Sequence, residues 1–415
     1  MRQTTYFSVF GKIQFQRHYY HTAGQKGICP LDAELSLPPN CYSYLLVDWA
    51  NYCAVNESYD ESIGILEKIL GLRLSKLALE SSVDINSSDV DIFYKEKPVP
   101  QSKEEGKIIV AQFDGKGVPM RQEEGSVKSS RLGKGEKPGK KKESIVNVIY
   151  TIEPYKRTPE DVFYALLPDL SDKYTNIMDF NHKRPLPVGK EVRATMDGKD
   201  IAFEYISGKV DQREGKHIKQ RVALTDGDDS LQRRVNDYLP SFTLVLDIIH
   251  TTEYLWDAAN AYLGERHPER TDWVGKQLLN ILSGKTEQVI MTLENIVENG
   301  SLSEARKKVV RKTIGYYRRN SPYMQYNKYL KKGWPIGTGV VEGACGHLVK
   351  DRMEGSGMLW KKEGAQSILD LRAVRMNKDW DKYQLYYQKT QHQRLYGSDS
   401  THSSTVENTM LNQVA

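Results

Sequence analysis

Three apolar runs that each end in an aspartate constrain the fold more than any other feature of the sequence. The runs are Ile108–Phe113, Arg221–Thr225 and Thr243–Leu246, and they are followed directly by Asp114, Asp226 and Asp247. Near-continuous apolar runs of this length are typical of strands buried on both faces of a sheet. The carboxyl ends of parallel strands lie at one edge, where open α/β sheets bind ligands. The sequence therefore predicts an α/β fold with acidic side chains along that edge.

The rest of the sheet and its connections can be predicted from shorter patterns. Residues Ile145–Ile152 and Ile201–Ile206 are expected to add two strands. Ser230–Tyr238 has the length and composition of a connecting helix, as a right-handed crossover requires. From about residue 251 to 319 the pattern is wholly helical, so we expect an all-helical insertion in the sheet domain.

A fourth acid follows the helical stretch. The segment Pro335–Gly339 breaks the chain with proline and two glycines, and a helix is predicted to start near Val340. That helix carries Glu342 in its first turn, so Glu342 can approach the sheet from a packing helix.

The N-terminal region is expected to be helical. Glu61–Leu70 has helical apolar spacing and stops at Gly71, and Ser75 can cap a second helix. This is the outline of a helix-turn-helix, although any helical hairpin has the same outline. The polar residues that follow, with Pro98 and Pro100, indicate a linker.

These patterns divide the chain into six parts. We predict an N-terminal helical DNA-binding region (1–86), a linker (87–106), the first part of a catalytic domain (107–250), a helical insertion (251–334), the last part of the catalytic domain (335–390) and a disordered tail (391–415).

Basic residues are concentrated although the net charge is only +5. Ten lysines and arginines and no acid lie between Ala305 and Lys332, with five tyrosines among them. Such a stretch can neutralise the phosphates of a polyanion, whereas a solvated helix face usually mixes both signs. The tyrosines can pack in the core or stack on unpaired bases. The loop from Arg121 to Lys142 is also basic, and contact with DNA and simple solvation explain it equally well.

The cysteines and the apolar residues exclude other classes. Four cysteines stand far apart without a Cys-x-x-Cys pair, so neither a disulfide framework nor a complete zinc ribbon is indicated, and zinc is not expected. No window is long and apolar enough for a membrane span or a secretory signal. The expected location is the cytoplasm, in association with the nucleoid.

The acids suit metal-dependent chemistry on phosphodiesters. Two-metal cleavage needs hard, anionic oxygen ligands that converge, and two aspartates with a glutamate supply them. Taken singly, each acid has a simpler explanation. Asp114-Gly115 and Asp226-Gly227 are ordinary turn dipeptides, and Glu342 can be an acid that favours the first turn of its helix.

Longer strings around these acids resemble a known family. They are Phe113–Arg121, Leu224–Asp228, Leu246–His250 with Glu253–Trp256, and Pro335–Cys345 with His347–Met353. Together they resemble the signature blocks of the ISKra-type insertion-sequence transposases, which belong to the DDE class and are related to the Mutator-like enzymes. The resemblance spans about Cys29 to Tyr387.

The resemblance implies a ribonuclease-H-like mixed sheet flanked by helices, with the helical insertion before the third acid. By position it makes Asp114, Asp226 and Glu342 the catalytic metal ligands for two Mg²⁺ or Mn²⁺ ions. Asp247 and His250 resemble the Asp-x-x-His pair of the family, which has a supporting role. The alternative, in which Asp247 itself is the second acid, stays open.

The implied activity is cleavage and strand transfer of double-stranded DNA at insertion-sequence ends, by a homo-oligomer that pairs two ends. Two alternatives remain, namely a repair or junction nuclease of the same fold and a domesticated, non-catalytic DNA-binding protein. The residues expected to contact DNA are Arg318, Arg319, Lys328, Lys331, Lys332, His347, Lys350 and Arg352.

Overall fold

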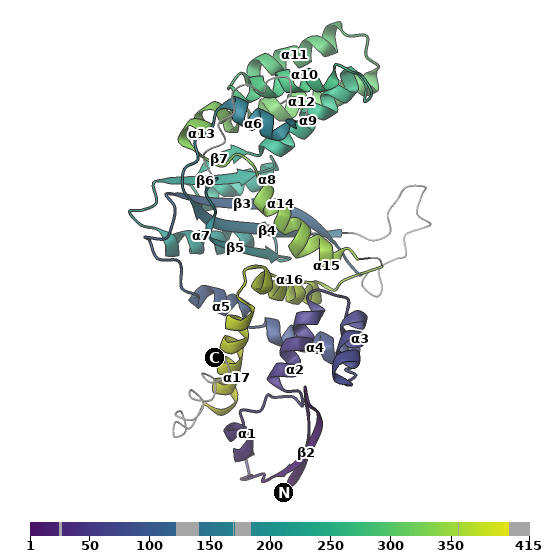
Figure 1. Cartoon of the computed structure of the whole chain (residues 1–415), viewed down its shortest axis with the longest axis vertical. Helices are drawn as coiled ribbons and strands as arrows, with labels where there is room; N and C mark the ends of the chain where they lie inside the picture. Colours follow the sequence, from purple (N-terminus) through teal and green to yellow (C-terminus); the bar gives the residue numbers. More distant parts are fainter. Residues whose placement is uncertain (25–26, 122–140, 169, 171–183, 356, 398–415) are drawn as a thin grey trace. The chain divides into compact units, whose positions relative to one another are not determined.

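The chain forms two compact units. The computed structural model describes residues 1–415 except 25–26, 122–140, 169, 171–183, 356 and 398–415 (Figure 1). The first unit comprises Met1–Lys97 together with Lys361–Ala415, and the second is the continuous segment Pro98–Trp360. Of the predicted tail 391–415, residues 398–415 lie outside the described residues, and so does most of the basic loop at 121–142.

The first unit joins an N-terminal hairpin to helices from both ends of the sequence. Strands β1 (Arg2–Ser8) and β2 (Gly11–Arg17) are antiparallel, and this hairpin was not predicted. The helices are α1 (Pro30–Glu34), α2 (Tyr44–Ala54), α3 (Tyr59–Leu70), α4 (Lys76–Ser87), α5 (Val90–Glu96), α16 (Lys362–Met376) and α17 (Trp380–Tyr396).

Local capping explains the boundaries of α3 and α4. Ser58 and Glu61 form a capping box at the start of α3, and Gly71 ends the helix in the left-handed conformation that glycine adopts without strain. The Ser75 side chain accepts the Ala78 N–H at 3.1 Å and starts α4. These two helices confirm the predicted helical hairpin, whereas DNA binding by it stays a prediction.

Three boundaries differ from those expected in this part of the chain. The predicted disordered tail 391–415 starts too early, because α17 continues to Tyr396. The predicted linker 87–106 contains α5, because Val90, Phe93 and Tyr94 recur at helical spacing and are buried. The predicted last part of the catalytic domain, 335–390, is divided at Trp360. Beyond it, α16 packs against α4, and Arg394 on α17 forms an ion pair with the buried Asp89.

The second unit is built on a five-stranded mixed sheet. The strand order is β5-β4-β3-β6-β7, in which β4 runs antiparallel to both neighbours and β3, β6 and β7 are parallel. The strands are β3 (Ile108–Pro119), β4 (Lys141–Ile152), β5 (Val188–Thr195), β6 (Gln220–Thr225) and β7 (Thr243–Leu246). A mixed five-stranded sheet flanked by helices is compatible with the expected ribonuclease-H-like fold (Figure 1).

Strand β3 is longer than the apolar run that predicted it. It pairs with β6 only as far as Gln112, but its antiparallel pairing with β4 continues to Pro119. Asp114 therefore lies within a strand, whereas Asp226 and Asp247 follow directly after β6 and β7.

One face of the sheet is covered by α7 (Lys199–Arg213) and α8 (Asp229–Tyr238). The Phe113 ring stacks on Phe203 of α7 with centroids 3.8 Å apart. The predicted strand Ile201–Ile206 was wrong, because it belongs to α7. The buried residues Ala202, Phe203, Ile206 and Val210 of α7 follow helical spacing, and the last three belong to the core that covers the sheet.

The other face carries α14 (Gly339–Ala344) and the π-helix η3 (Cys345–Lys350), which contact β3. Side chains along β3 alternate between the two faces of the sheet, and Ile109, Ala111 and Phe113 belong to the core under α7. Gln112 and Asp114 must then point to the face of α14. The short helix α15 (Asp351–Met353) follows η3.

A block of helices lies between β7 and α14, as predicted. It comprises α9 (Ile248–Tyr262), α10 (Arg270–Leu282), α11 (Thr286–Asn299), α12 (Glu304–Asn320), the 3-10 helix η2 (Ser321–Tyr323) and α13 (Tyr326–Lys332). Helix α6 (Pro159–Leu166) packs against α10 and α13. In the described part of the chain, every helix is too short or too polar to span a membrane.

Candidate active site

Three aspartates lie at the carboxyl-terminal edge of three adjacent parallel strands, Asp114 within β3 and Asp226 and Asp247 directly after β6 and β7. Gln112 pairs with Leu224, and Thr225 pairs with Leu246. Continuing both registers by one or two residues brings Asp114, Asp226 and Asp247 into one row across β3, β6 and β7. Because side chains alternate along a strand, all three point to the face that carries α14. This register agrees with the sequence prediction that the aspartates lie along one edge of the sheet.

The carboxylates of Asp114 and Asp226 interact electrostatically. Both residues are half-buried. Burial raises the pKa of Asp226 and the nearby Asp114 carboxylate raises it further, although the Asp228 N–H that donates to Asp226 Oδ1 at 3.0 Å lowers it. The N–H of Gly115 donates to Asp114 Oδ1 at 2.7 Å. A cation between these strands would relieve the repulsion.

Asp247 is fully buried and caps α9. Its Oδ2 accepts the backbone N–H of His250 at 2.7 Å and lies 2.9 Å from His250 Nδ1. Its Oδ1 accepts the N–H of Thr338 at 2.7 Å. Asp247 thus fixes both the histidine and the loop that precedes α14.

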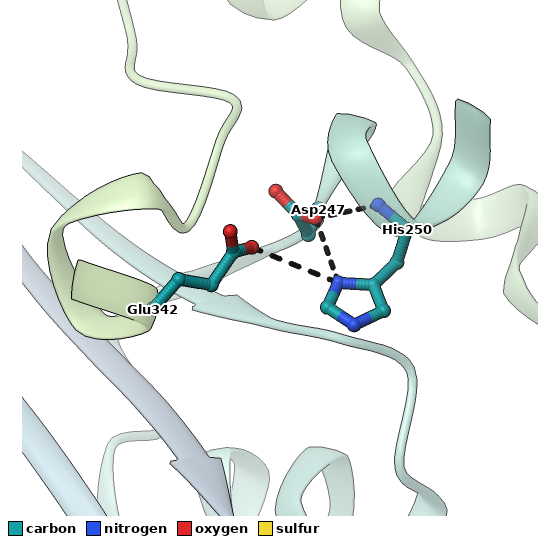
Figure 2. Close-up of side chains that lie close together, drawn as sticks. All are labelled: Asp247, His250 and Glu342. Carbon is teal, nitrogen blue, oxygen red and sulfur yellow. Dashed lines mark hydrogen bonds and ion pairs between the residues drawn. The ribbon is translucent and has the colours of Figure 1, made fainter. Parts of the chain in front are cut away.

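His250 lies between Asp247 and Glu342 (Figure 2). The hydrogen bond to Asp247 and the charges of Asp247 and Asp226 raise the pKa of His250 to about 9 despite partial burial. Its Nδ1 also lies 3.8 Å from Glu342 Oε1. At neutral pH the imidazolium therefore links Asp247 on the sheet side to Glu342 on α14.

Glu342 approaches from α14, as the sequence predicted. Its side chain is 34% exposed. Burial raises the pKa of Glu342, and Asp247 and Asp114 raise it further, whereas the hydrogen bond from Thr338 and the charge of His250 lower it. The charges of Asp114 and Asp247 therefore act on the Glu342 carboxylate, although both residues lie more than ninety positions away in sequence.

Two uncharged residues that the sequence analysis missed hold α14 in place. Thr338 donates its hydroxyl to Glu342 Oε1 at 2.5 Å while its backbone N–H binds Asp247. Gln112, two residues before Asp114, accepts the Val341 N–H at 3.1 Å and donates to the Gly337 carbonyl at 3.4 Å. The Gly-Thr-Gly string was the available signal for Thr338, but nothing in the sequence indicated Gln112.

Cys345 follows Glu342 at the junction of α14 and η3. It is buried, and burial together with the Asp114 carboxylate, to which it is hydrogen-bonded, raises the pKa of the Cys345 thiol. The thiol is therefore protonated and packs beside Asp114.

The site is rich in the oxygen ligands that divalent cations prefer. Among the residues that the structure describes, one group of potential metal ligands has atoms within 4.8 Å of one another, and it consists of Asp247, His250 and Glu342. The predicted set of Asp114, Asp226 and Glu342 does not form a group this close. Asp226, Asp247 and Glu342 nevertheless interact with the single His250, and burial together with neighbouring carboxylates raises the pKa of Asp226 and of Glu342. The residues fit divalent cations on these grounds.

The predicted DNA contacts differ in exposure. Arg318, Arg319, Lys328, Lys331, Lys332, His347 and Lys350 are exposed, and His347 pairs with Asp351 at 3.0 Å. Arg352 is only 2% exposed, and its guanidinium lies over the Trp360 ring. This burial contradicts the predicted contact of Arg352 with DNA, because the side chain is part of the core.

The tyrosines of the basic stretch are mainly core residues. Tyr316, Tyr317, Tyr326 and Tyr329 are buried, and Tyr323 packs against the core under α7 and α8. Of the two roles considered for these rings, the structure supports packing in the core.

Comparisons with known proteins add little to this geometry. The chain matches no known protein-family model and no curated protein. Among solved structures it is similar to a Drosophila P element transposase strand transfer complex, with 12% sequence identity and a TM-score of 0.28 over 84% of this chain and 81% of that one. This similarity is too low to assign a fold or a function.

Proposed function

We propose that the protein is a DNA transposase of the DDE class that cleaves and joins DNA strands with divalent metal ions. The observation that carries this proposal is the row of Asp114, Asp226 and Asp247 across three adjacent strands, with Glu342 facing it from α14. The resemblance of the surrounding strings to ISKra-type transposases supports the same activity.

Asp114, Asp226 and Glu342 are the proposed ligands of two Mg²⁺ or Mn²⁺ ions. Asp114 and Asp226 are half-buried at the strand edge, and Glu342 is partly exposed, so all three are accessible from the site. When bound, the two ions supply an activated water or 3′-hydroxyl nucleophile and neutralise the charge that develops on the phosphate oxygens.

We propose that Asp247 positions neighbouring groups and is not one of the primary metal ligands. Its two oxygens already accept the N–H groups of His250 and Thr338, and it has no exposed surface. This arrangement favours Asp226 over Asp247 as the second catalytic acid. His250, held by Asp247, can donate a proton to an oxygen bound in the site.

The test uses the purified chain with Mg²⁺ or Mn²⁺ and a plasmid that carries the DNA flanking its gene. We expect cleavage at the element ends and joining of a precut 3′-hydroxyl end to target DNA. Asp114→Asn, Asp226→Asn and Glu342→Gln should abolish both reactions and leave DNA binding intact. The exposed Asp237, on α8, gives the matched control Asp237→Asn, which should keep full activity.

The outcomes separate the proposal from its alternatives. Cleavage without joining would identify a nuclease of the same fold. Binding without either reaction would identify a non-catalytic DNA-binding protein. Undiminished strand transfer by Asp114→Asn would refute the assignment of the site.

A further inference from the structure

Helix α12 carries an unusual concentration of exposed cations next to the candidate site. Its inner side is buried through Val310, Thr313, Ile314, Tyr316 and Tyr317 and packs on α9 and α11. Its outer side exposes lysines and arginines along the whole helix, namely Arg306, Lys308, Arg311, Lys312, Arg318 and Arg319.

Helical spacing sorts five of these six cations into two rows. Lys308, Lys312 and Arg319 are four and seven residues apart, so they project along one line of the helix. Arg311 and Arg318 lie on a different line and are paired with acids, Glu304 and Glu294 respectively. We call the first set, Lys308, Lys312 and Arg319, the basic row.

The two lysines of the basic row are not neutralised by acids. In the part of the chain that the structure describes, neither Lys308 nor Lys312 forms an ion pair, and the Lys312 ammonium lies 5.0 Å from the centre of the Tyr254 ring. Gly315, between Lys312 and Arg319, has open space where a side chain would project. The row therefore presents charge on an unobstructed surface.

The basic row ends at the turn that carries Asp226. The Tyr316 hydroxyl donates to the Asp226 carbonyl at 2.7 Å, and Arg319 donates to the Gly227 carbonyl at 3.2 Å. Gly227 has a φ of +96°, and a side chain there would collide with the Tyr316 ring. Arg319 also pairs with the exposed Asp229 at 2.8 Å, and a bound phosphate would compete for it. Helix α12 is thus fixed to the catalytic turn.

We propose that the basic row binds the phosphate backbone of duplex DNA and guides it to Asp226. Eleven residues of α-helix span about 16 Å, which corresponds to about five base steps of one DNA strand. The partner follows from charge, since two exposed lysines without acidic partners and an arginine paired only with an exposed aspartate suit a polyanion. That the bound duplex is the DNA to be cleaved rests on the proposed function.

The experiment compares two double variants on the same helix. Lys308→Gln with Lys312→Gln removes two charges of the basic row, and Arg311→Gln with Arg318→Gln removes two charges from the paired line. Binding of a short fluorescent DNA duplex is measured by anisotropy in EDTA at several salt concentrations. For the basic-row variant we expect the slope of log K against log salt to become shallower by about two, one for each lost phosphate contact. The control variant should change this slope by less than one. Circular dichroism verifies that both double variants are folded.

Several results would overturn the proposal. Equal changes in both variants would mean that only overall charge matters, and an unchanged slope in the basic-row variant would exclude contact. Preference for single-stranded DNA or RNA through the same two lysines would show that the partner is wrong. Because the assay contains no metal, a reduced slope together with unimpaired cleavage by Asp114→Asn would reject the proposed catalytic site while supporting the basic row.

Discussion

At the scale of single residues, the site depends on uncharged groups as much as on its acids. Thr338 contacts Asp247 through its backbone and Glu342 through its side chain, so one residue fixes two acids from different elements. Groups that orient metal ligands in this way commonly change metal affinity when they are lost.

Thr338→Val tests this role. Valine keeps the shape of the side chain and the backbone N–H to Asp247, but it cannot donate to Glu342. We expect Mn²⁺ to bind about 10-fold more weakly, as measured by isothermal titration calorimetry. Thr338→Ser keeps the hydroxyl and should bind Mn²⁺ like the wild type. Equal affinity in all three proteins would contradict a positioning role for Thr338.

His250 should make the stability of the metal-free protein depend on pH. Its pKa is raised from 6.5 to about 9, so the folded state binds a proton that the unfolded chain has already lost. The stabilisation is complete below about pH 6.5 and disappears as the pH rises through 9. Urea unfolding in EDTA at these two pH values should show a larger loss in the wild type than in His250→Asn. A loss of the same size in both would argue against the Asp247–His250 interaction.

At the scale of elements, the sequence allowed the prediction of strands and helices that have a clear local pattern of apolar residues. The apolar runs before Asp114, Asp226 and Asp247 gave three strands correctly, because strands buried on both faces have few polar residues. Ile201–Ile206 was assigned to a strand although its buried positions follow a helix, since a short apolar run fits both. The contact of Gln112 with Val341 joins residues 229 apart, and no local pattern carries such information.

Gln112→Leu tests how β3 holds α14. Leucine leaves the Val341 N–H without its acceptor in a buried place, so the free energy of unfolding should fall by about 1–3 kcal/mol, as measured with urea. Mn²⁺ affinity should fall too, because α14 carries Glu342. Gln232→Leu is the matched control, since Gln232 is also buried but donates to Asn320 on α12 at 2.7 Å. It should lose stability but keep Mn²⁺ affinity, and equal metal binding by both variants would contradict the role of Gln112.

At the scale of the whole molecule, the residues predicted to be a polar linker begin the second unit with a buried ion pair. Glu105 accepts a hydrogen bond from Arg213 at 2.6 Å, and both side chains are almost completely buried. Arg213 also donates to the carbonyl of Gly189 on β5. The segment before β3 is thereby fixed to the sheet.

Glu105→Gln should destabilise the second unit strongly. It leaves the buried Arg213 without a countercharge, which costs about 3–5 kcal/mol of unfolding free energy. The neighbouring Glu104 is exposed, and Glu104→Gln should change this free energy by no more than about 0.5 kcal/mol. Chemical denaturation of both variants measures the difference, and similar stabilities would show that the pair contributes little.

The interleaved order of the two units has a consequence for biosynthesis. The first unit needs α16 and α17, which the ribosome makes only after the whole of Pro98–Trp360 has been synthesised. Domains fold as units while the chain is being made. The sheet with its acids can therefore finish folding before α16 and α17 are available to pack against α2 to α5. The first unit begins to be translated first but completes its folding last.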